Sequence, residues 1–202
     1  MPPLTREALV GDDVVAQARG LVGAHVETGF GESLTRARIV ETEAYRGRDD
    51  RAAHSYGYKR TKRTEVFFGE AGRAYVYLCY GIHRMFNVIV GPVGEPNAVL
   101  VRAVEPLVGT GLMLRRRKLE RGSRRLTGGP GLVTQALGIT LDDNGCDLFS
   151  AASQVRLSGP FGSLPAKQLT VGPRVGVDYA GACALRPWRF RESGNAYTSP
   201  AK

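Results

Sequence analysis

Cysteine is scarce in this chain of 202 residues, and the three that occur, Cys79, Cys146 and Cys183, stand far apart. Neither a Cys-x-x-Cys pair nor a cluster of histidines accompanies them. A disulfide framework and a thiolate site for zinc or an iron–sulfur cluster both need closely spaced ligands, so the sequence supports neither. We expect buried thiols, no metal and no cofactor.

Long apolar runs are missing as well. No stretch approaches the ~20 apolar residues of a membrane-spanning helix, and Met1–Arg6 lacks the apolar core of a signal peptide. We therefore expect no membrane partner, and a location in the cytoplasm with the nucleoid if the source is prokaryotic or in the nucleus if it is eukaryotic. The chain also lacks a glycine-rich phosphate loop of the Walker or Rossmann type, because Gly128–Gly131 only opens an expected helix.

Positive charge is abundant. The chain has 28 Lys and Arg against 19 Asp and Glu, a net charge of +9. Such an excess attracts a polyanion, with nucleic acid as the expected partner and an anionic membrane as the rival. The basic residues gather in two blocks, Lys59–Arg63 and Arg115–Arg125. The first block is the better candidate for phosphate contacts, whereas the second is equally well explained as a solvated helix face.

The length fits one domain over residues 1–202. We expect an α+β fold, a single compact domain in which a curved, mostly antiparallel sheet has flanking helices. The expected strands are 24–29 and 36–45, joined as a hairpin, followed by 73–80, 85–90 and 98–104. The expected helices are 14–22, 107–120 and 130–137, with a polar loop over 46–63 and strand and loop over 139–172.

A carboxylate and several aromatic rings are concentrated in two segments. If Arg38–Tyr45 is a strand, Glu41, Glu43 and Tyr45 share one face with Ile39. Val40, Thr42 and Ala44 then point the other way.

The second segment, Ala74–Gly81, alternates too. It places Tyr75 and Tyr77 on one face and Tyr80 at the strand end, just before a turn-favouring glycine. Taken alone, alternating tyrosines indicate packing, and a lone histidine such as His54 is more often structural than functional. The joint occurrence is what indicates a site.

Several motifs together resemble those of the alkyladenine (3-methyladenine) DNA glycosylases of the animal and bacterial type. They follow the order of that family over almost the whole chain, which makes a chance match very improbable. The motifs are Glu41–Tyr45, Ala52–Ser55, Tyr75–Gly81, Asn87, Val99–Pro106, Leu126–Gly138, Pro173–Gly181 and Arg186–Phe190.

The resemblance implies an enzyme of base-excision repair that binds double-stranded DNA as a monomer, without metal or cofactor. It would flip alkylated or deaminated purines, of the 3-methyladenine, 7-methylguanine, hypoxanthine and ethenoadenine class, out of the duplex and hydrolyse the N-glycosidic bond, leaving an abasic site. Stacking on aromatic rings suits cationic alkylated purines. Because no lysine occupies the matched pocket positions, the resemblance implies a monofunctional hydrolase rather than a Schiff-base lyase.

The same resemblance assigns roles to single residues. Glu43 matches the general base, and Arg102 matches a residue that positions the water and the target phosphate. The base pocket would be formed by Tyr45, His54, Tyr77 and Asn87, and Tyr80 would be the wedge that fills the gap in the duplex. Contacts with the DNA backbone are expected from Arg60, Lys62, Arg63, His83 and Arg84.

Some alternatives remain open. Alternation alone does not rank Glu41 against Glu43, and the expected role of Glu41 is structural, pairing with an arginine such as Arg38 or holding backbone amides. An oxygen-rich metal site is an alternative, although the spacing of its candidate ligands matches no known metal motif. These ligands would be Glu41, Glu43, Asp49, Asp50 and His54. A different function, a non-catalytic nucleic-acid-binding protein with a basic face and an aromatic platform, fits the same composition. At five positions this chain departs from the family pattern that it otherwise resembles. The residues found there are Lys62, Thr64, His83, Arg84 and Leu132.

Overall fold

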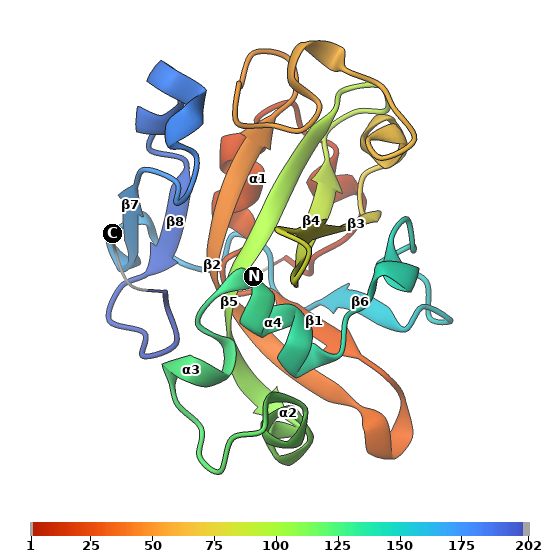
Figure 1. The fold of residues 1–202 in the computed structure, drawn as a ribbon, viewed down its shortest axis with the longest axis vertical. Coiled ribbons are helices and arrows are strands. Elements are labelled where there is room, and N and C mark those ends of the chain that lie inside the picture. The colour runs from red at the N-terminus through yellow and green to blue at the C-terminus, as the bar shows by residue number, and fades with distance from the viewer. Residues whose placement is uncertain (1, 200–202) are drawn as a thin grey trace.

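A curled antiparallel sheet organises the protein (Figure 1). The computed structural model describes residues 2–199, and the strands within that range follow the order β3-β4-β5-β2-β1-β6, with β8 paired to β2 and β7 paired to β8. The strands are β1 (His25–Thr28), β2 (Thr35–Arg46), β3 (Ala74–Cys79), β4 (His83–Val90), β5 (Asn97–Val108), β6 (Val155–Ser158), β7 (Leu169–Gly172) and β8 (Arg189–Glu192). The predicted α+β class and the predicted strands are confirmed, whereas the outer limits of the predicted domain, residues 1 and 202, lie outside the described residues.

Two of the predicted helices are confirmed almost to the residue. Helix α1 (Val14–Leu21) begins after Asp13, whose carboxylate accepts hydrogen bonds from two backbone amides of the first turn. Helix α4 (Pro130–Leu137) has proline at its first position and ends at Gly138, which has a φ of 75°. Neither helix is long and apolar enough to cross a membrane, and the same is true of the other helices within residues 2–199.

The predicted helix over 107–120 is wrong at its beginning. Strand β5 continues through Val108, and α2 (Thr110–Arg117) starts only after Gly109. Gly109 has a φ of 74°, a conformation that neither a strand nor a helix continues, so the chain changes direction there. A further short helix, α3 (Arg124–Thr127), was not predicted.

The predicted face of β2 needs one correction. The pairing of β2 with β5 shifts between Ile39 and Glu41, which marks a β-bulge at Val40. The bulge reverses the alternation, so Ile39 packs in the main hydrophobic core while Glu41 and Glu43 lie on the opposite face with Tyr45. The carboxylates and the tyrosine do share a face, as predicted, but without Ile39.

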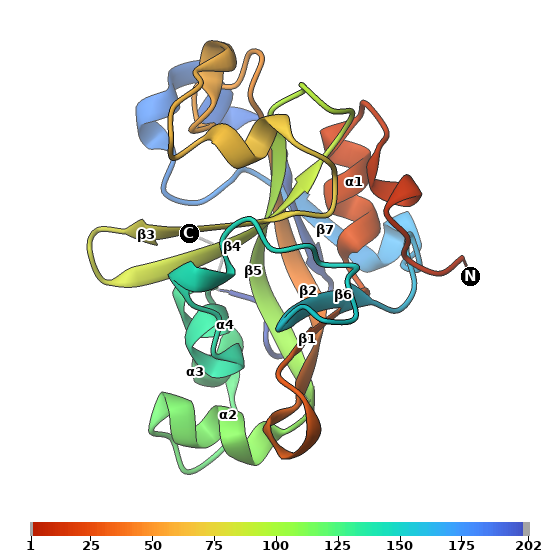
Figure 2. The same ribbon diagram turned by 90° about the vertical axis from the view of Figure 1, so that its right-hand side faces the viewer.

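Strands β3 and β4 form a hairpin that projects from the body beside α4 (Figure 2). At its tip, Ile82 donates a backbone hydrogen bond to the carbonyl of Cys79, and both residues between them have positive φ, 50° at Tyr80 and 71° at Gly81. Positive φ at both central positions is the requirement of a type I′ turn, which matches the twist of the two strands.

The core is divided so that it leaves a cavity. The main cluster packs the sheet against helices α1 and α4. Two smaller clusters are separate from it, one around Phe67 and Tyr75 and one around Ala52 and Val177. All four of these residues line one cavity, so the smaller clusters form its walls.

Candidate active site

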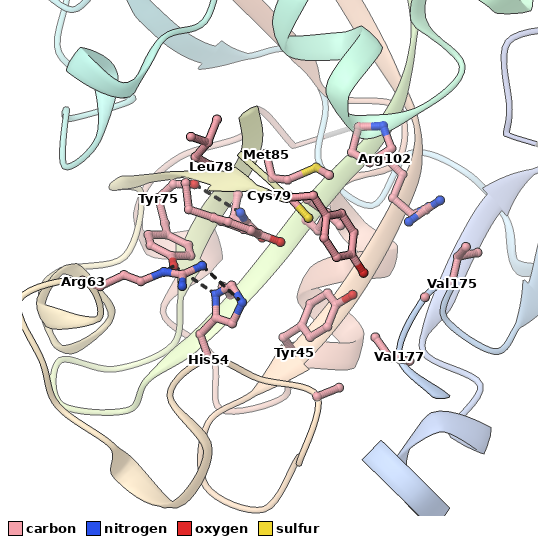
Figure 3. Close-up of a pocket in the computed structure, with 18 of the residues that line it drawn as sticks. Tyr45, His54, Arg63, Tyr75, Leu78, Cys79, Met85, Arg102, Val175 and Val177 are labelled. Atoms are coloured by element: carbon pink, nitrogen blue, oxygen red, sulfur yellow. Dashed lines mark hydrogen bonds between the residues drawn. The ribbon is translucent and has the colours of Figure 1, made fainter. Parts of the chain in front are cut away.

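A cavity of about 490 Å³ opens between the β3–β4 hairpin, the loop that follows β2 and the segment that follows β7. Figure 3 shows Tyr45 and Arg102 on the side of the cavity near Val175 and Val177, with His54, Arg63 and Tyr75 grouped on another side. Most of the residues predicted to form a site line this cavity: Tyr45, His54, Arg63, Tyr77, Tyr80, Asn87 and Arg102. Segments that are more than 100 residues apart in the sequence are thereby brought together.

Glu43 lies directly behind the lining residues and is fully buried. The hydroxyl of Tyr45 donates to its Oε2 over 2.7 Å, and the backbone amide of Val175 donates to its Oε1 over 2.8 Å. Nη1 of Arg102 lies 3.3 Å from the same Oε1. Tyr45, Val175 and Arg102 all line the cavity, so each of the three contacts of Glu43 connects the carboxylate with the cavity wall.

Arg102 joins the two buried glutamates. Its Nε donates to Oε1 of Glu41 over 2.9 Å while its Nη1 faces Glu43. Burial opposes the charge of Arg102, but the carboxylates of Glu43 and Glu41 outweigh that cost and raise the pKa of Arg102. Arg102 is therefore a fixed cation between two carboxylates at the base of the cavity.

Glu41 is held by hydrogen bonds from residues that do not all line the cavity. Besides Arg102, it accepts hydrogen bonds from Nε of Arg189 and from both the amide and the hydroxyl of Ser199. The predicted pairing of Glu41 with an arginine is confirmed at Arg102 and Arg189. The suggested partner Arg38 is wrong, because Arg38 lies in an ion-pair cluster with Glu105 and Glu192. The predicted contact with a backbone amide is confirmed at Ser199.

The aromatic side of the cavity is tightly packed. The ring of His54 meets the ring of Tyr77 edge to face with centroids 4.6 Å apart, and Tyr77 stacks on Tyr75 at 5.2 Å. Nδ1 of His54 is 3.0 Å from the hydroxyl of Tyr75. Because His54 and Tyr77 are in direct contact, a base can stack on Tyr77 only from beside His54 or after the two rings separate.

Burial, followed by the charge of Arg63, lowers the pKa of His54 to about 4. The imidazole is therefore neutral near pH 7. Burial, with a smaller contribution from Glu43, raises the pKa of Tyr45 well above its ordinary value, so its hydroxyl keeps the proton that it donates to Glu43. Burial likewise raises the pKa of Tyr77.

Asn87 and Tyr80 occupy opposite environments. Asn87 is buried in the cavity wall, and its Nδ2 donates to the carbonyl of Tyr75, its pairing partner on β3, over 3.1 Å. Tyr80 is 91% exposed at the tip of the hairpin. Its positive φ is uncommon for an aromatic residue and is required by the type I′ turn at the tip.

Comparison with known proteins agrees with this geometry. A sequence description of the family "Methylpurine-DNA glycosylase (MPG)" matches residues 8–196. The chain is 42% identical over 200 residues to a protein of Bacillus cereus (strain AH820) and to one of Bacillus anthracis (strain CDC 684 / NRRL 3495), in each case covering 93% of this chain and 94% of the relative. Both relatives carry the name "Putative 3-methyladenine DNA glycosylase". The chain belongs to the methylpurine-DNA glycosylase family.

Membership makes the protein a DNA glycosylase, a hydrolase of N-glycosyl bonds whose partner is DNA and whose role is the repair of alkylation damage. The cavity, the buried glutamate and the exposed tyrosine are thus features of a family member.

In this glycosylase the basic side chains of the loop Lys59–Arg63 have different surroundings. Arg60 forms an ion pair with Glu65 and lies over the ring of Phe68, away from the cavity, while Lys62 is exposed. Arg63 reaches the cavity instead. His83 and Arg84 are exposed at the start of β4, and His83 packs close to Gly131 in the first turn of α4. The structure does not bring Arg60 together with the other site residues.

Sequence reasoning missed a buried ion pair that holds the glycosylase cavity together. Arg174 pairs with both oxygens of Asp50, and neither side chain has any exposed surface. Arg174 also donates to the carbonyls of Ala44 and Cys183, and its guanidinium lies 4.7 Å from the centroid of the Tyr45 ring. The pair therefore ties β2, the loop before His54 and the 3₁₀ helix η7 (Asp178–Leu185) to one another.

Arg174 lies in the family motif Pro173–Gly181, and only that motif could have indicated it. Its partner Asp50 is 124 residues away, so no local pattern in the sequence connects the two residues. The cysteines also differ from the prediction. Cys183 is buried, but Cys79 and Cys146 are partly exposed, and Cys79 lines the cavity.

Proposed function

We propose that this glycosylase removes alkylated or deaminated purines from double-stranded DNA, acting as a monomer, and that Glu43 is its general base. The observation that carries the proposal is the position of Glu43: its carboxylate is buried immediately behind an aromatic cavity and is oriented by Tyr45, Val175 and Arg102. The substrate class is purine lesions of the 3-methyladenine, 7-methylguanine, hypoxanthine and ethenoadenine type.

A base inside a duplex hides its glycosidic bond, so the enzyme must rotate the nucleotide out of the stack. Tyr80 is suited to fill the resulting gap, because its ring is almost fully exposed at the tip of a projecting two-stranded hairpin. Ile82 in the same tip is 71% exposed and extends the apolar surface that would enter the minor groove.

The extruded base would enter the cavity and stack between Tyr45 and Tyr77, with His54 closing one side. Asn87 lies in the wall and would restrict which exocyclic groups fit, since a buried amide rejects a group that it cannot hydrogen-bond. This leaves the sugar near Arg102 and Glu43 at the base of the cavity.

Departure of the base leaves positive charge on the deoxyribose, which a carboxylate can stabilise while it deprotonates the attacking water. A carboxylate offers about four acceptor sites, and Tyr45, Val175 and Arg102 use three of those on Glu43. Val175 and Arg102 both contact Oε1 and Tyr45 contacts Oε2, so the free acceptor site is on Oε2, and we propose that the attacking water binds there. Arg102 would then position the target phosphate and, through its contact with the carboxylate, the water.

The residues that line the described cavity include no lysine, which supports a monofunctional hydrolase over a Schiff-base lyase. The test is incubation with a duplex that carries one lesion, followed by alkali, which cleaves DNA at abasic sites. Lesion-dependent cleavage only after alkali supports the proposal. Binding without any released base would instead support a non-catalytic nucleic-acid-binding protein, and cleavage before alkali would support a lyase.

A further inference from the structure

The guanidinium of Arg63 touches three rings of the cavity at once. Its Nε donates to the hydroxyl of Tyr75 over 3.1 Å, and its Nη2 lies 3.5 Å from Nε2 of His54, as the dashed lines of Figure 3 show. Its central carbon is also 5.1 Å from the centroid of the Tyr77 ring. Arg63 therefore lines the part of the cavity that a base stacked on Tyr77 would contact.

Among the residues that the structure describes, no carboxylate pairs with the charge of Arg63. Around the cavity, Glu41 and Glu43 share Arg102, Glu41 also pairs with Arg189, and Asp50 pairs with Arg174. These groups are three carboxylates and three arginines. No carboxylate within residues 2–199 forms an ion pair with Arg63, in contrast to Arg60, which pairs with Glu65 in the same loop. Arg63 thus gives the cavity an excess of positive charge.

The contacts of His54 indicate which ring nitrogen faces Arg63. An arginine can only donate, so Nε2 of His54 must accept from Arg63, and Nδ1 then carries the proton toward Tyr75. Both ring nitrogens of His54 are then engaged within the wall, so the donors that this wall can offer to a base are the remaining N–H groups of Arg63. A base that enters the cavity meets hydrogen-bond donors and positive charge on the side of Arg63.

We propose that Arg63 is a specificity-determining residue that favours neutral purine lesions with hydrogen-bond acceptors on their exposed edge over cationic alkylated purines. The inference rests on the proposed function and refines its substrate class. A cationic base stacked on Tyr77 is repelled by Arg63, whereas a neutral base can accept a hydrogen bond from the guanidinium. The stacking of cationic purines on these tyrosines, expected from their quadrupole alone, is correspondingly weakened.

The test compares two duplexes, one with a single 7-methylguanine, which is cationic, and one with a single hypoxanthine, which is neutral. Single-turnover excision rates are measured for the wild type, Arg63→Met and Arg63→Lys. Arg63→Met removes the charge and the donors while keeping the length, so we expect the ratio of the 7-methylguanine rate to the hypoxanthine rate to rise about tenfold. Arg63→Lys keeps the charge, so we expect the logarithm of this ratio to rise by less than half of the rise in Arg63→Met.

Arg60→Met is the matched control, because it removes the same charge from the same loop but at a side chain that lies over Phe68. It should leave the ratio of the two rates unchanged, even where both rates fall. A ratio that rises equally in Arg60→Met would overturn the inference, since a general change in protein charge would then explain it.

Two further outcomes separate this inference from the function on which it rests. If Arg63→Met lowers both rates by the same factor and flattens the salt dependence of DNA binding, Arg63 is a phosphate contact and the inference is wrong while the proposed function stands. A wild-type protein that releases neither base would overturn the proposed function and this inference with it.

Discussion

The hydroxyl of Tyr45 donates a hydrogen bond to the carboxylate of Glu43 over 2.7 Å, although the two residues belong to the same strand and are only two positions apart. Alternation along β2 places both side chains on one face. The contact joins Glu43, the proposed general base, to Tyr45, a ring of the proposed pocket for the extruded purine. A change in the position of either side chain would therefore affect the other.

Glu43→Gln should retain lesion binding and lose several orders of magnitude in single-turnover rate, because the amide keeps the shape but neither deprotonates water nor stabilises the positive sugar. Glu41→Gln should behave differently. Its carboxylate balances Arg102 and Arg189, so we expect a loss of about 3–5 kcal/mol in the free energy of unfolding and a much smaller effect on the rate of the folded fraction. Denaturant unfolding and single-turnover assays on both variants separate the two roles, and a larger loss of rate in Glu41→Gln would reverse the assignment.

Tyr80→Asn should stabilise the protein while impairing excision. Asparagine adopts positive φ more readily than tyrosine, so the turn should gain about 0.5–1 kcal/mol. Loss of the ring should slow extrusion most for lesions in stable base pairs and least for lesions in mismatches, which are already partly open. Tyr58→Asn is the control, since Tyr58 is also exposed with positive φ but does not line the cavity. Equal slowing on paired and mismatched lesions would indicate that Tyr80 is not the wedge.

Asp50→Asn should destabilise the fold strongly, because it leaves Arg174 buried beside a neutral partner. The expected loss is about 3–5 kcal/mol in the free energy of unfolding, measured with denaturant. Glu65→Gln, which breaks the exposed pair with Arg60, is the comparison and should cause a far smaller loss. Similar losses in both variants would contradict the view that the buried pair ties the cavity walls together.

The stability of the protein should depend on His54 between about pH 6.5 and pH 4. The pKa of His54 is about 4 in the folded state and about 6.5 in an unfolded chain, so the unfolded state takes up the proton first as the pH falls. The contribution of the neutral imidazole is therefore fully present above pH 6.5 and is lost as the pH falls toward 4. Unfolding curves for the wild type and His54→Asn should converge or cross over this interval, whereas a constant difference would show that the folded-state pKa is not lowered.

Lys62 is the better candidate for a phosphate contact in the basic loop, because Arg60 is paired with Glu65 and Arg63 reaches the cavity. Lys62→Ala should weaken binding to damaged and undamaged duplexes alike. It should also reduce the slope of log affinity against log salt by about 0.9, the value for one phosphate contact. An unchanged slope would show that Lys62 only solvates the loop.

Local sequence determined much of this protein. Short-range alternation predicted that Glu41, Glu43 and Tyr45 share a face, because the side chains of a strand repeat every two residues. The glycine at Gly138 correctly predicted the end of α4, and Gly81 the turn that exposes Tyr80, because both adopt positive φ. The order of motifs along the chain was sufficient to indicate the family.

The tertiary structure decided everything that depends on partners distant in the sequence. The bulge at Val40 removed Ile39 from the face of the glutamates, and a bulge arises from the pairing of two strands rather than from either sequence alone. Glu41 and Glu43 differ in the partners that they contact, and the distinguishing ones, Arg189, Ser199 and Val175, lie more than 130 residues away. The balance of charge around a cavity is a property of the folded chain, so only the structure could show that Arg63, an exposed arginine in a polar loop, lines the cavity and pairs with no carboxylate within residues 2–199.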